Sequence, residues 1–291
     1  AEEVAMAVTL SGKDVAAALT AQIKEEAAKL QSTGTAPKLA ILRVGEREDD
    51  LSYERGALKR AETCGVAVER VALPADTCQE ELEAQLRRLS ADDTVHGILM
   101  FRPLPSHLDQ KAAEALIDPA KDVDGITEGS LAGVFMNSGE GFAPCTAAAC
   151  MEVLHHYGID CTGKRAAVIG RSLVVGRPVA MMLMHENATP TICHTKTADA
   201  PAITREADIV VVAAGRMESI GKEYFSAGQT VLDVGIGWNP EKNKLCGDVK
   251  YEEVNQIAGA ITPVPGGVGT VTTSVLMKHT VRAAMNQAHQ Q

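Results

Sequence analysis

Short apolar segments alternate with segments whose apolar residues recur at helical spacing, along the whole chain. In the first half, apolar runs at residues 38–44, 66–74 and 96–101 each stand next to such a helical segment. Runs of this length bounded by turn residues are typical of buried strands, and helices between strands make the strands parallel. The expected strands of the second half are residues 165–170, 189–194, 208–215 and 229–235. The expected helices are residues 12–31, 53–63, 79–92, 149–158 and 177–186. We therefore predict an α/β protein with two open parallel-sheet domains.

The length of the chain indicates more than one domain, and its net charge bears on the partners it can bind. A chain of 291 residues exceeds the usual size of a single core, and Gly, Pro and Ser concentrate at residues 139–148, where we expect the domain boundary. The net charge of −10 provides no basic field, so we expect neither nucleic acid nor a membrane as a partner. No apolar run approaches the roughly 18 residues of a membrane span, and the acidic first residues do not resemble a signal peptide. This leaves the cytoplasm or an organelle that processes the protein, and we expect a cytoplasmic protein.

The seven cysteines are scattered and never spaced as C-x-x-C. This pattern predicts reduced, mostly buried thiols, and no metal site.

The sequence AAVIGRSLVVGRP at residues 166–178 reads as a strand, a glycine turn and a helix. A dinucleotide-binding turn needs small residues so that the backbone approaches the pyrophosphate at the N-terminus of the helix. Gly170 makes the turn, Ser172 takes the second position, and Gly176 comes one residue later than the usual third glycine. The pattern favours nucleotide binding over a purely structural turn.

The end of the next strand bears on the choice of cofactor. An NAD-binding domain places an acidic residue about 20 residues beyond the glycine turn, to accept hydrogen bonds from the ribose hydroxyls. This chain has His194 and Thr195 there, and no acid, whereas Arg171 and Arg177 lie in the turn and the first helical turn. Cations and hydroxyls suit a 2′-phosphate, so we predict NADP. The competing interpretation is that the arginines are solvated surface residues.

Four stretches together resemble the methylenetetrahydrofolate dehydrogenase/methenyltetrahydrofolate cyclohydrolase family. They are RPLP at residues 102–105, KDVDG at 121–125, GRSLVVGRP at 170–178 and TPVPGGVG at 262–269. The resemblance covers essentially the whole chain. It implies NADP-dependent oxidation of 5,10-methylenetetrahydrofolate in one-carbon metabolism, a folate-binding domain, a Rossmann-like NADP domain, a cleft between them and a homodimer. We expect the folate-binding domain to comprise residues 1–147 and 271–291, and the NADP domain residues 148–270.

The resemblance also implies roles for individual residues. The family uses the aspartate matching Asp124 to accept N–H bonds from the aminopyrimidine edge of the pterin. The loop containing Pro263, Gly266 and Gly267 lines the substrate site beside the nicotinamide in relatives. The competing interpretations are that Asp124 is a turn residue and that this loop is a plain tight turn. The expected cofactor-binding residues are Gly170, Arg171, Ser172, Val175, Gly176, Arg177, His194, Thr195, Ala214, Gly215, Asp233 and Gly235. Asp233, at the end of a strand, is alternatively only a cap for the next turn.

Two positions depart from the family pattern. The family carries Tyr-x-x-x-Lys on one helix face, but here the pair is Tyr53 and Ala57. It also has Gln-Leu before Pro-Leu-Pro, where this chain has Phe101 and Arg102. Hydride transfer needs positioning and no side-chain base, whereas hydrolysis of the methenyl product needs proton transfer worth about 10² to 10⁴ in rate. We therefore predict a dehydrogenase with weak or absent cyclohydrolase activity, with Tyr53 and Asp124 as its catalytic residues.

Alternatives to this interpretation stay open. Arg102 or Arg55 as an electrostatic substitute, Lys59 on an irregular helix, or Tyr53 acting alone would preserve both activities. A non-catalytic folate-binding protein is the alternative from another class, and Tyr53 would then serve packing alone.

Overall fold

The computed structural model describes residues 5–290 and divides the chain into two compact units. The first unit contains the described residues up to Ala16 together with Thr146–Thr272. The second unit contains Ala17–Cys145 and the residues from Thr273 onward. The divisions at both ends of the chain fall inside long helices, α1 (Gly12–Ser32) and α10 (Val268–Gln290).

The first unit is built on a six-stranded parallel sheet in the order β1-β11-β8-β7-β5-β6. Its strands are β1 (Val8–Thr9), β5 (Arg165–Ile169), β6 (Thr189–Cys193), β7 (Ile209–Val212), β8 (Thr230–Asp233) and β11 (Ala260–Ile261). The central strands β5, β7 and β8 are almost wholly buried, which explains their continuous apolar sequences. Their carboxyl ends therefore meet at one edge of the sheet, where open α/β sheets bind ligands.

Helices and a hairpin complete this unit. The helices are α6 (Cys145–His156), α7 (Gly176–His185), α8 (Ala200–Arg205), α9 (Tyr251–Val254) and the 3₁₀ turn η2 (Lys222–Tyr224). The antiparallel hairpin β9 (Gly237–Asn239) and β10 (Lys244–Cys246) follows β8. Glu218 fastens it, because its carboxylate accepts hydrogen bonds from Asn239 Nδ2 at 3.0 Å and Lys242 Nζ at 2.5 Å.

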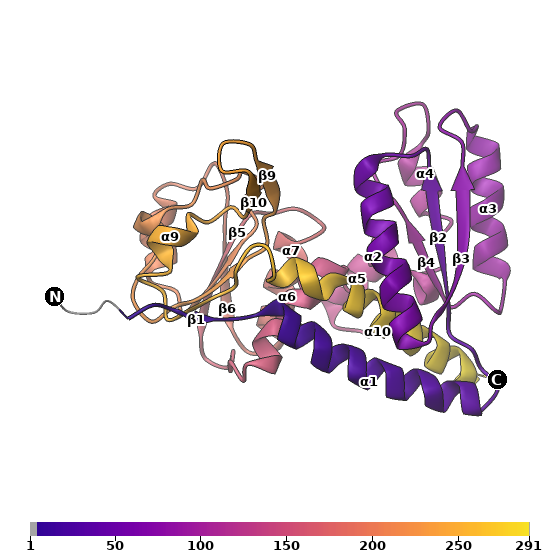
Figure 1. Ribbon diagram of the computed structural model, residues 1–291, viewed down its shortest axis with the longest axis horizontal. Helices are drawn as coiled ribbons and strands as arrows, with labels where there is room; N and C mark the ends of the chain where they lie inside the picture. Colours follow the sequence, from indigo (N-terminus) through magenta and orange to yellow (C-terminus); the bar gives the residue numbers. More distant parts are fainter. Residues whose placement is uncertain (1–4, 291) are drawn as a thin grey trace. The chain divides into compact units, whose positions relative to one another are not determined.

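The second unit has a three-stranded parallel sheet in the order β3-β2-β4, with α2 and α3 on either side (Figure 1). Its elements are β2 (Lys38–Val44), β3 (Ala67–Leu73), β4 (Gly97–Met100), α2 (Glu48–Cys64), α3 (Gln79–Ala91), α4 (Gln110–Glu114), η1 (Pro119–Lys121) and α5 (Glu128–Met136). Leu82, Leu86 and Leu89 of α3 are fully buried against Ala40 and Leu42 of β2. Spacing of three and four residues places these leucines on one helix face, so burial fixes how α3 lies on the sheet.

The structure differs from the expected organisation in three places. The described residues up to Ala16 belong with the first unit, since β1 pairs with β11 through Val8 and Thr9. Helix α2 begins at Glu48 rather than Tyr53, with three acids in its first turn, where negative charge suits the helix dipole. The hairpin β9–β10 was not predicted from the sequence.

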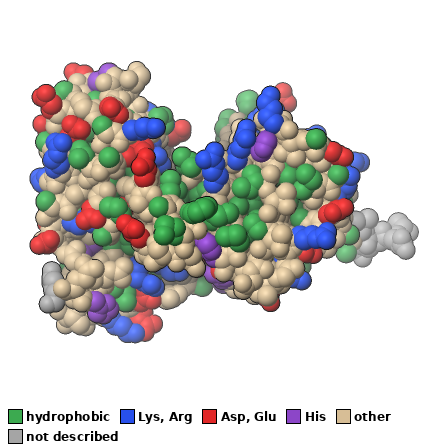
Figure 2. All heavy atoms as spheres, turned by 180° about the vertical axis from the view of Figure 1, so that it is seen from behind, with side chains coloured by type: hydrophobic (Ala, Val, Ile, Leu, Met, Phe, Trp, Pro, Cys, Tyr) green, Lys and Arg blue, Asp and Glu red, His purple; other side chains and the backbone are tan. Residues whose placement is uncertain are grey.

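The helices and the visible surface both carry charged residues. None of the helices among residues 5–290 is long and apolar enough to cross a membrane. On the face shown in Figure 2, acidic and basic side chains are interspersed with neutral ones, as the overall charge balance leads one to expect.

Candidate active site

The carboxyl ends of the central strands of the first unit surround a cavity of about 850 Å³. Nine of the twelve residues expected to bind the cofactor line it: Gly170, Arg171, Ser172, Val175, His194, Thr195, Ala214, Gly215 and Gly235. They come from the loops that follow β5, β6, β7 and β8. The topology therefore brings residues 65 positions apart, from 170 to 235, to one edge of the sheet.

The turn after β5 approaches α7 more closely than any side chain allows. Gly170 has φ +118°, and a Cβ on Gly176 would lie 2.1 Å from the Gly170 carbonyl oxygen. Val175 N donates to Ser172 Oγ at 3.0 Å, which closes the turn just before the helix begins. Gly176 is buried and outside the cavity lining, so its role is to let the helix pack on the strand. In a dinucleotide-binding turn the third glycine allows this close packing of helix and strand, and Gly176 does so here although it comes one residue later.

The corner of the cavity after β6 carries the residues expected to select NADP. His194 N donates to Thr197 Oγ1 at 2.8 Å, and this turn places His194 and Thr195 in the lining with Arg171. Arg177 is exposed on the first turn of α7 and is not part of the lining. Arg216, which the sequence analysis did not single out, also lines the cavity. Arginines and hydroxyls together suit a phosphate group.

Asp233 does not line the cavity, contrary to its expected place at the cofactor. It is 3% exposed, and its carboxylate accepts backbone N–H groups from Gly235, Asp248 and Val249 at 3.1 Å each. Burial raises the pKa of Asp233 to about 7. Asp233 therefore shapes the loop that supplies Gly235, as a cap does.

Asp248 performs a related task that the sequence analysis missed. It lines the cavity, and its Oδ2 accepts the Gly215 N–H at 2.9 Å. Burial raises the pKa of Asp248 as well. Only the fold reveals this contact, because 33 positions separate the two residues.

In the second unit, the two aspartates of KDVDG have different surroundings. Asp122 is 0% exposed and accepts hydrogen bonds from the N–H groups of Ile126 and Thr127 and from the Thr127 hydroxyl, at 2.7–3.1 Å. Asp124 is half-buried. Burial raises the pKa of Asp124 to about 7, while the positive charge of Arg102 acts to lower it. Asp122 therefore fixes the loop, and Asp124 is the carboxylate available for a ligand.

Cys145 lies beside this loop. Its thiol donates to the Val123 carbonyl oxygen at 3.3 Å, and burial raises its pKa far above the usual value. A thiol with a raised pKa stays neutral and is a weak nucleophile.

Ala57 lies on the buried face of α2. Ala57 is 0% exposed, and Phe101 is 9% exposed. The Phe101 ring meets the Tyr53 ring edge to face, with centroids 5.7 Å apart and planes at 82°. The family pattern has lysine at position 57, where this chain has only a methyl group. It has glutamine at position 101, where this chain has the phenyl ring that contacts Tyr53.

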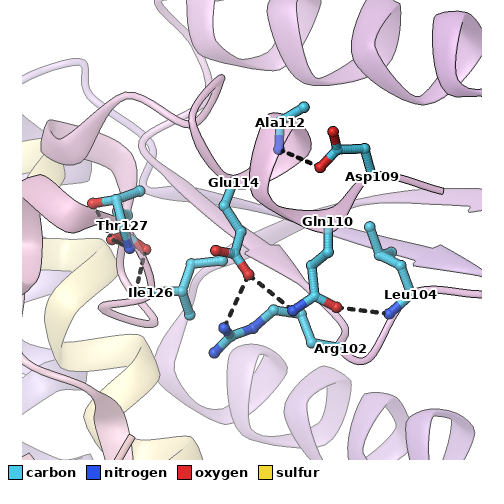
Figure 3. A network of polar contacts seen from close by, with 9 residues as sticks. Arg102, Leu104, Asp109, Gln110, Ala112, Glu114, Ile126 and Thr127 are labelled. Carbon is cyan, nitrogen blue, oxygen red and sulfur yellow. Dashed lines mark hydrogen bonds and ion pairs between the residues drawn. The ribbon is translucent and has the colours of Figure 1, made fainter. Parts of the chain in front are cut away.

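Arg102 is held in a network with Glu114 and Gln110 (Figure 3). Its NH1 lies 3.2 Å from Glu114 Oε1, which also accepts Gln110 Nε2 at 3.0 Å. Gln110 Oε1 in turn accepts the Leu104 N–H at 3.0 Å. The network joins the RPLP loop to α4.

The loop with Pro263, Gly266 and Gly267 lies in the first unit, between β11 and α10. Gly266 has φ +93°, and its carbonyl oxygen accepts the Gly12 N–H at 2.8 Å. A Cβ on Gly12 would lie 1.9 Å from the Gly267 carbonyl oxygen. This close approach at the start of α1 gives the loop a structural reason for its glycines in addition to the expected one.

Comparison with known proteins agrees with this geometry. Residues 10–124 match the catalytic domain of tetrahydrofolate dehydrogenase/cyclohydrolase, and residues 144–288 match the NAD(P)-binding domain of the same family. The bifunctional protein FolD of Carboxydothermus hydrogenoformans is 50% identical over 279 residues, which cover 96% of this chain and 97% of the relative. The chain belongs to the tetrahydrofolate dehydrogenase/cyclohydrolase family.

Solved structures of the family share the fold. The bifunctional FolD enzyme of Campylobacter jejuni aligns with a TM-score of 0.93 at 39% identity, covering 96% of this chain and 99% of that one. The Trypanosoma brucei FolD protein, solved with NADP cofactor and an inhibitor, aligns with a TM-score of 0.91 at 37% identity, covering 98% and 99%. The expected family, α/β fold and parallel sheets are thereby confirmed.

Proposed function

We propose that the protein oxidises 5,10-methylenetetrahydrofolate to 5,10-methenyltetrahydrofolate with NADP, and hydrolyses the methenyl product weakly or not at all. The observation that carries the second half is that neither family position near Tyr53 carries a titratable group: Ala57 is a buried methyl group, and Phe101 packs its ring edge to face on Tyr53. No amine is available from either position to transfer protons.

The cavity of the first unit fits NADP. The turn at residues 170–175 and the N-terminus of α7 would hold the pyrophosphate, and the small residues there leave room for close backbone approach. Arg171 and Thr195 would bind the 2′-phosphate, and the backbone at Ala214 and Gly215, held by Asp248, would support the rest. The bound cofactor supplies the hydride acceptor.

Asp124 is proposed to anchor the folate. As a carboxylate it accepts two N–H bonds from the aminopyrimidine edge of the pterin, and charge-assisted bonds of this kind orient a planar ring. Tyr53 is proposed to contact the same substrate near its reacting carbon. Orientation of this kind is sufficient for the oxidation, because a nitrogen lone pair of the substrate pushes out the hydride.

The opening of the methenyl cation has a different requirement. Water must attack the bridging carbon, and protons must move between water, nitrogen and the solvent, which calls for a titratable group at the site. Arg102 is paired with Glu114, and the guanidinium group stays protonated. Arg55 is paired with Glu48, and Lys59 is exposed on α2. A fully bifunctional enzyme would have to use one of these substitutes, or Tyr53 acting alone.

Spectrophotometry with methylenetetrahydrofolate and NADP tests the oxidation. We expect NADP reduction, with a much lower rate when NAD replaces NADP. Folate binding without any turnover would instead identify a non-catalytic binding protein. We also propose a homodimer, from the family resemblance, to be tested by light scattering after size-exclusion chromatography.

A further inference from the structure

Two side chains donate hydrogen bonds to the carbonyl group that precedes Asp124. The Val123 carbonyl oxygen lies 2.8 Å from His279 Nδ1 of α10, and it accepts the Cys145 thiol at 3.3 Å. A carbonyl oxygen only accepts hydrogen bonds, so His279 carries a proton on Nδ1 in this contact. Both donors belong to the second unit, although 156 positions separate His279 from Val123.

The Val123 carbonyl is part of the peptide group that joins Val123 to Asp124. A peptide group is planar, so an orientation fixed at its oxygen also fixes the direction of the bond from the nitrogen to the Cα of Asp124. The Val123 side chain is 0% exposed and packs on β4, where a Cβ on Gly97 would lie 2.9 Å from Val123 Cγ2. Val123 is therefore held through its side chain as well as through its carbonyl oxygen.

The residue that follows Asp124 is also held in place. Gly125 has φ +70°, and its N–H donates to the Asp122 carbonyl oxygen at 3.1 Å. A Cβ on Gly125 would lie 2.4 Å from the Pro144 nitrogen, so the loop packs directly on the backbone that precedes α6. The backbone is thus fixed on both sides of Asp124.

The His279 ring has a defined place of its own. The Phe142 ring lies beside it, with centroids 5.0 Å apart and planes at 35°. The Phe142 N–H donates to Ser130 Oγ at 3.2 Å, which ties that segment to α5. An imidazole restrained in this way loses little further side-chain freedom when it donates to Val123.

We infer that His279 is a positioning residue, which holds the Val123 carbonyl so that the Asp124 carboxylate meets the pterin in one orientation. The inference rests on the proposed role of Asp124 as the folate anchor. A carboxylate that accepts two N–H groups of a planar ring tolerates little angular error, because a rotation weakens both hydrogen bonds together. His279 acts through Val123 and does not itself contact the substrate.

Steady-state kinetics with methylenetetrahydrofolate and NADP test the inference. His279→Leu removes the donor and keeps most of the bulk, and we expect the KM for the folate to rise about three- to tenfold. The KM for NADP and kcat should stay within about twofold, because the loss concerns folate binding alone. A role in stability alone would lower the active fraction, and with it kcat, and would leave the folate KM unchanged.

Two more variants at the same position guard against a trivial effect of leucine. His279→Ala also removes the donor without placing a new group beside the Phe142 ring, and it should raise the folate KM by a similar factor. His279→Asn has an amide N–H close to the position of Nδ1–H, so it should restore most of the wild-type KM. Circular dichroism verifies the fold of each variant.

The matched control is Gln287→Leu. Gln287 also lies on α10 and donates from its side chain to a backbone carbonyl of the same unit, that of Asp93 at 2.6 Å. Its loss should leave the folate KM at the wild-type value. An unchanged folate KM in His279→Leu and His279→Ala overturns the inference, as does an equal rise in Gln287→Leu or in His279→Asn.

Asp124→Asn separates this failure from failure of the proposed anchor. If Asp124→Asn leaves the folate KM unchanged, the anchor is wrong and the inference fails with it. If Asp124→Asn raises the folate KM strongly while His279→Leu leaves it unchanged, the anchor stands and only the role of His279 is wrong.

The double variant, Asp124→Asn with His279→Leu, decides the case in which both single variants raise the folate KM. Residues that act through one another are not additive. A KM close to that of Asp124→Asn alone supports action through Asp124. A KM raised by the product of the two single effects would show that His279 acts elsewhere, and would overturn the inference.

Discussion

At the scale of single residues, the fold gives neighbouring residues of one motif different surroundings and different contacts. In KDVDG, Asp122 satisfies three donors of its own loop, whereas Asp124 is half-buried and has the raised pKa. On α2, Glu54 and Ala57 are buried, while Tyr53 meets the ring of Phe101. Neighbouring positions on one loop or one helix therefore differ in burial and in contacts.

Restoring the family residues at two positions should restore proton transfer. Ala57 is fully buried, so Ala57→Lys alone buries an amine without a designed polar partner and should destabilise the fold by about 1–3 kcal/mol. Ala57→Lys with Phe101→Gln replaces the ring by a polar partner, and we expect hydrolysis of methenyltetrahydrofolate to rise by about tenfold or more. The control is Ala57→Met with Phe101→Gln, which has similar bulk and no amine. An equal gain in both double variants would show that space, and not the amine, is limiting.

Arg171 should govern the preference between the two nicotinamide cofactors. Loss of a charge-assisted hydrogen bond to phosphate costs about 1.5–3 kcal/mol, so Arg171→Leu should weaken NADP binding by roughly tenfold or more. NAD lacks the 2′-phosphate, and its affinity should hardly change. Isothermal titration with both cofactors measures the two effects. Equal weakening for NADP and NAD would mean that Arg171 does not contact the 2′-phosphate.

At the scale of elements, α2 is fastened to its sheet by charge as well as by apolar packing. Glu54 accepts Arg43 Nε from β2 at 3.2 Å and both Nε and NH2 of Arg70 from β3 at 3.2 Å. Arg43 and Glu54 are buried. The cluster fixes the rotation of the helix that carries Tyr53.

Glu54→Gln is a nearly isosteric change, yet it should lower the free energy of unfolding strongly. It leaves the buried Arg43 without a counter-charge, and breaking such a pair costs about 3–5 kcal/mol. Urea denaturation followed by circular dichroism gives the change in unfolding free energy. Glu48→Gln breaks an exposed pair with Arg55 on the same helix and should have little effect. A small loss for Glu54→Gln would mean that apolar contacts alone position α2.

The elements also show what the sequence can and cannot predict. The core strands β2, β5 and β7 were predicted because buried parallel strands are continuous apolar runs. Strands β1 and β11 have two residues each, and the hairpin strands have three, too short for any periodicity to show. The start of α2 was placed at Tyr53 because residues 46–50 look like a charged loop, although acids are favourable in a first helical turn.

At the scale of the whole molecule, two units of similar architecture divide the tasks. The cavity of the first unit could be predicted where one contiguous motif, GRSLVVGRP, supplies part of its lining through Gly170, Arg171, Ser172 and Val175. Asp248 and Arg216 could not, because their place depends on which strand ends become neighbours in the sheet. Asp233 was expected to bind the cofactor because it lies at the end of a strand. Its carboxylate instead accepts hydrogen bonds from backbone N–H groups.

The separation of the two activities is the central claim, and the decay of supplied methenyltetrahydrofolate tests it most directly. The decay is followed by absorbance with the wild-type enzyme and in buffer alone, after NADP-dependent oxidation has been demonstrated in the same preparation. We predict a rate within about twofold of the spontaneous one, since neither Ala57 nor Phe101 offers a group for general acid–base catalysis. An acceleration of about 10² or more would contradict the account.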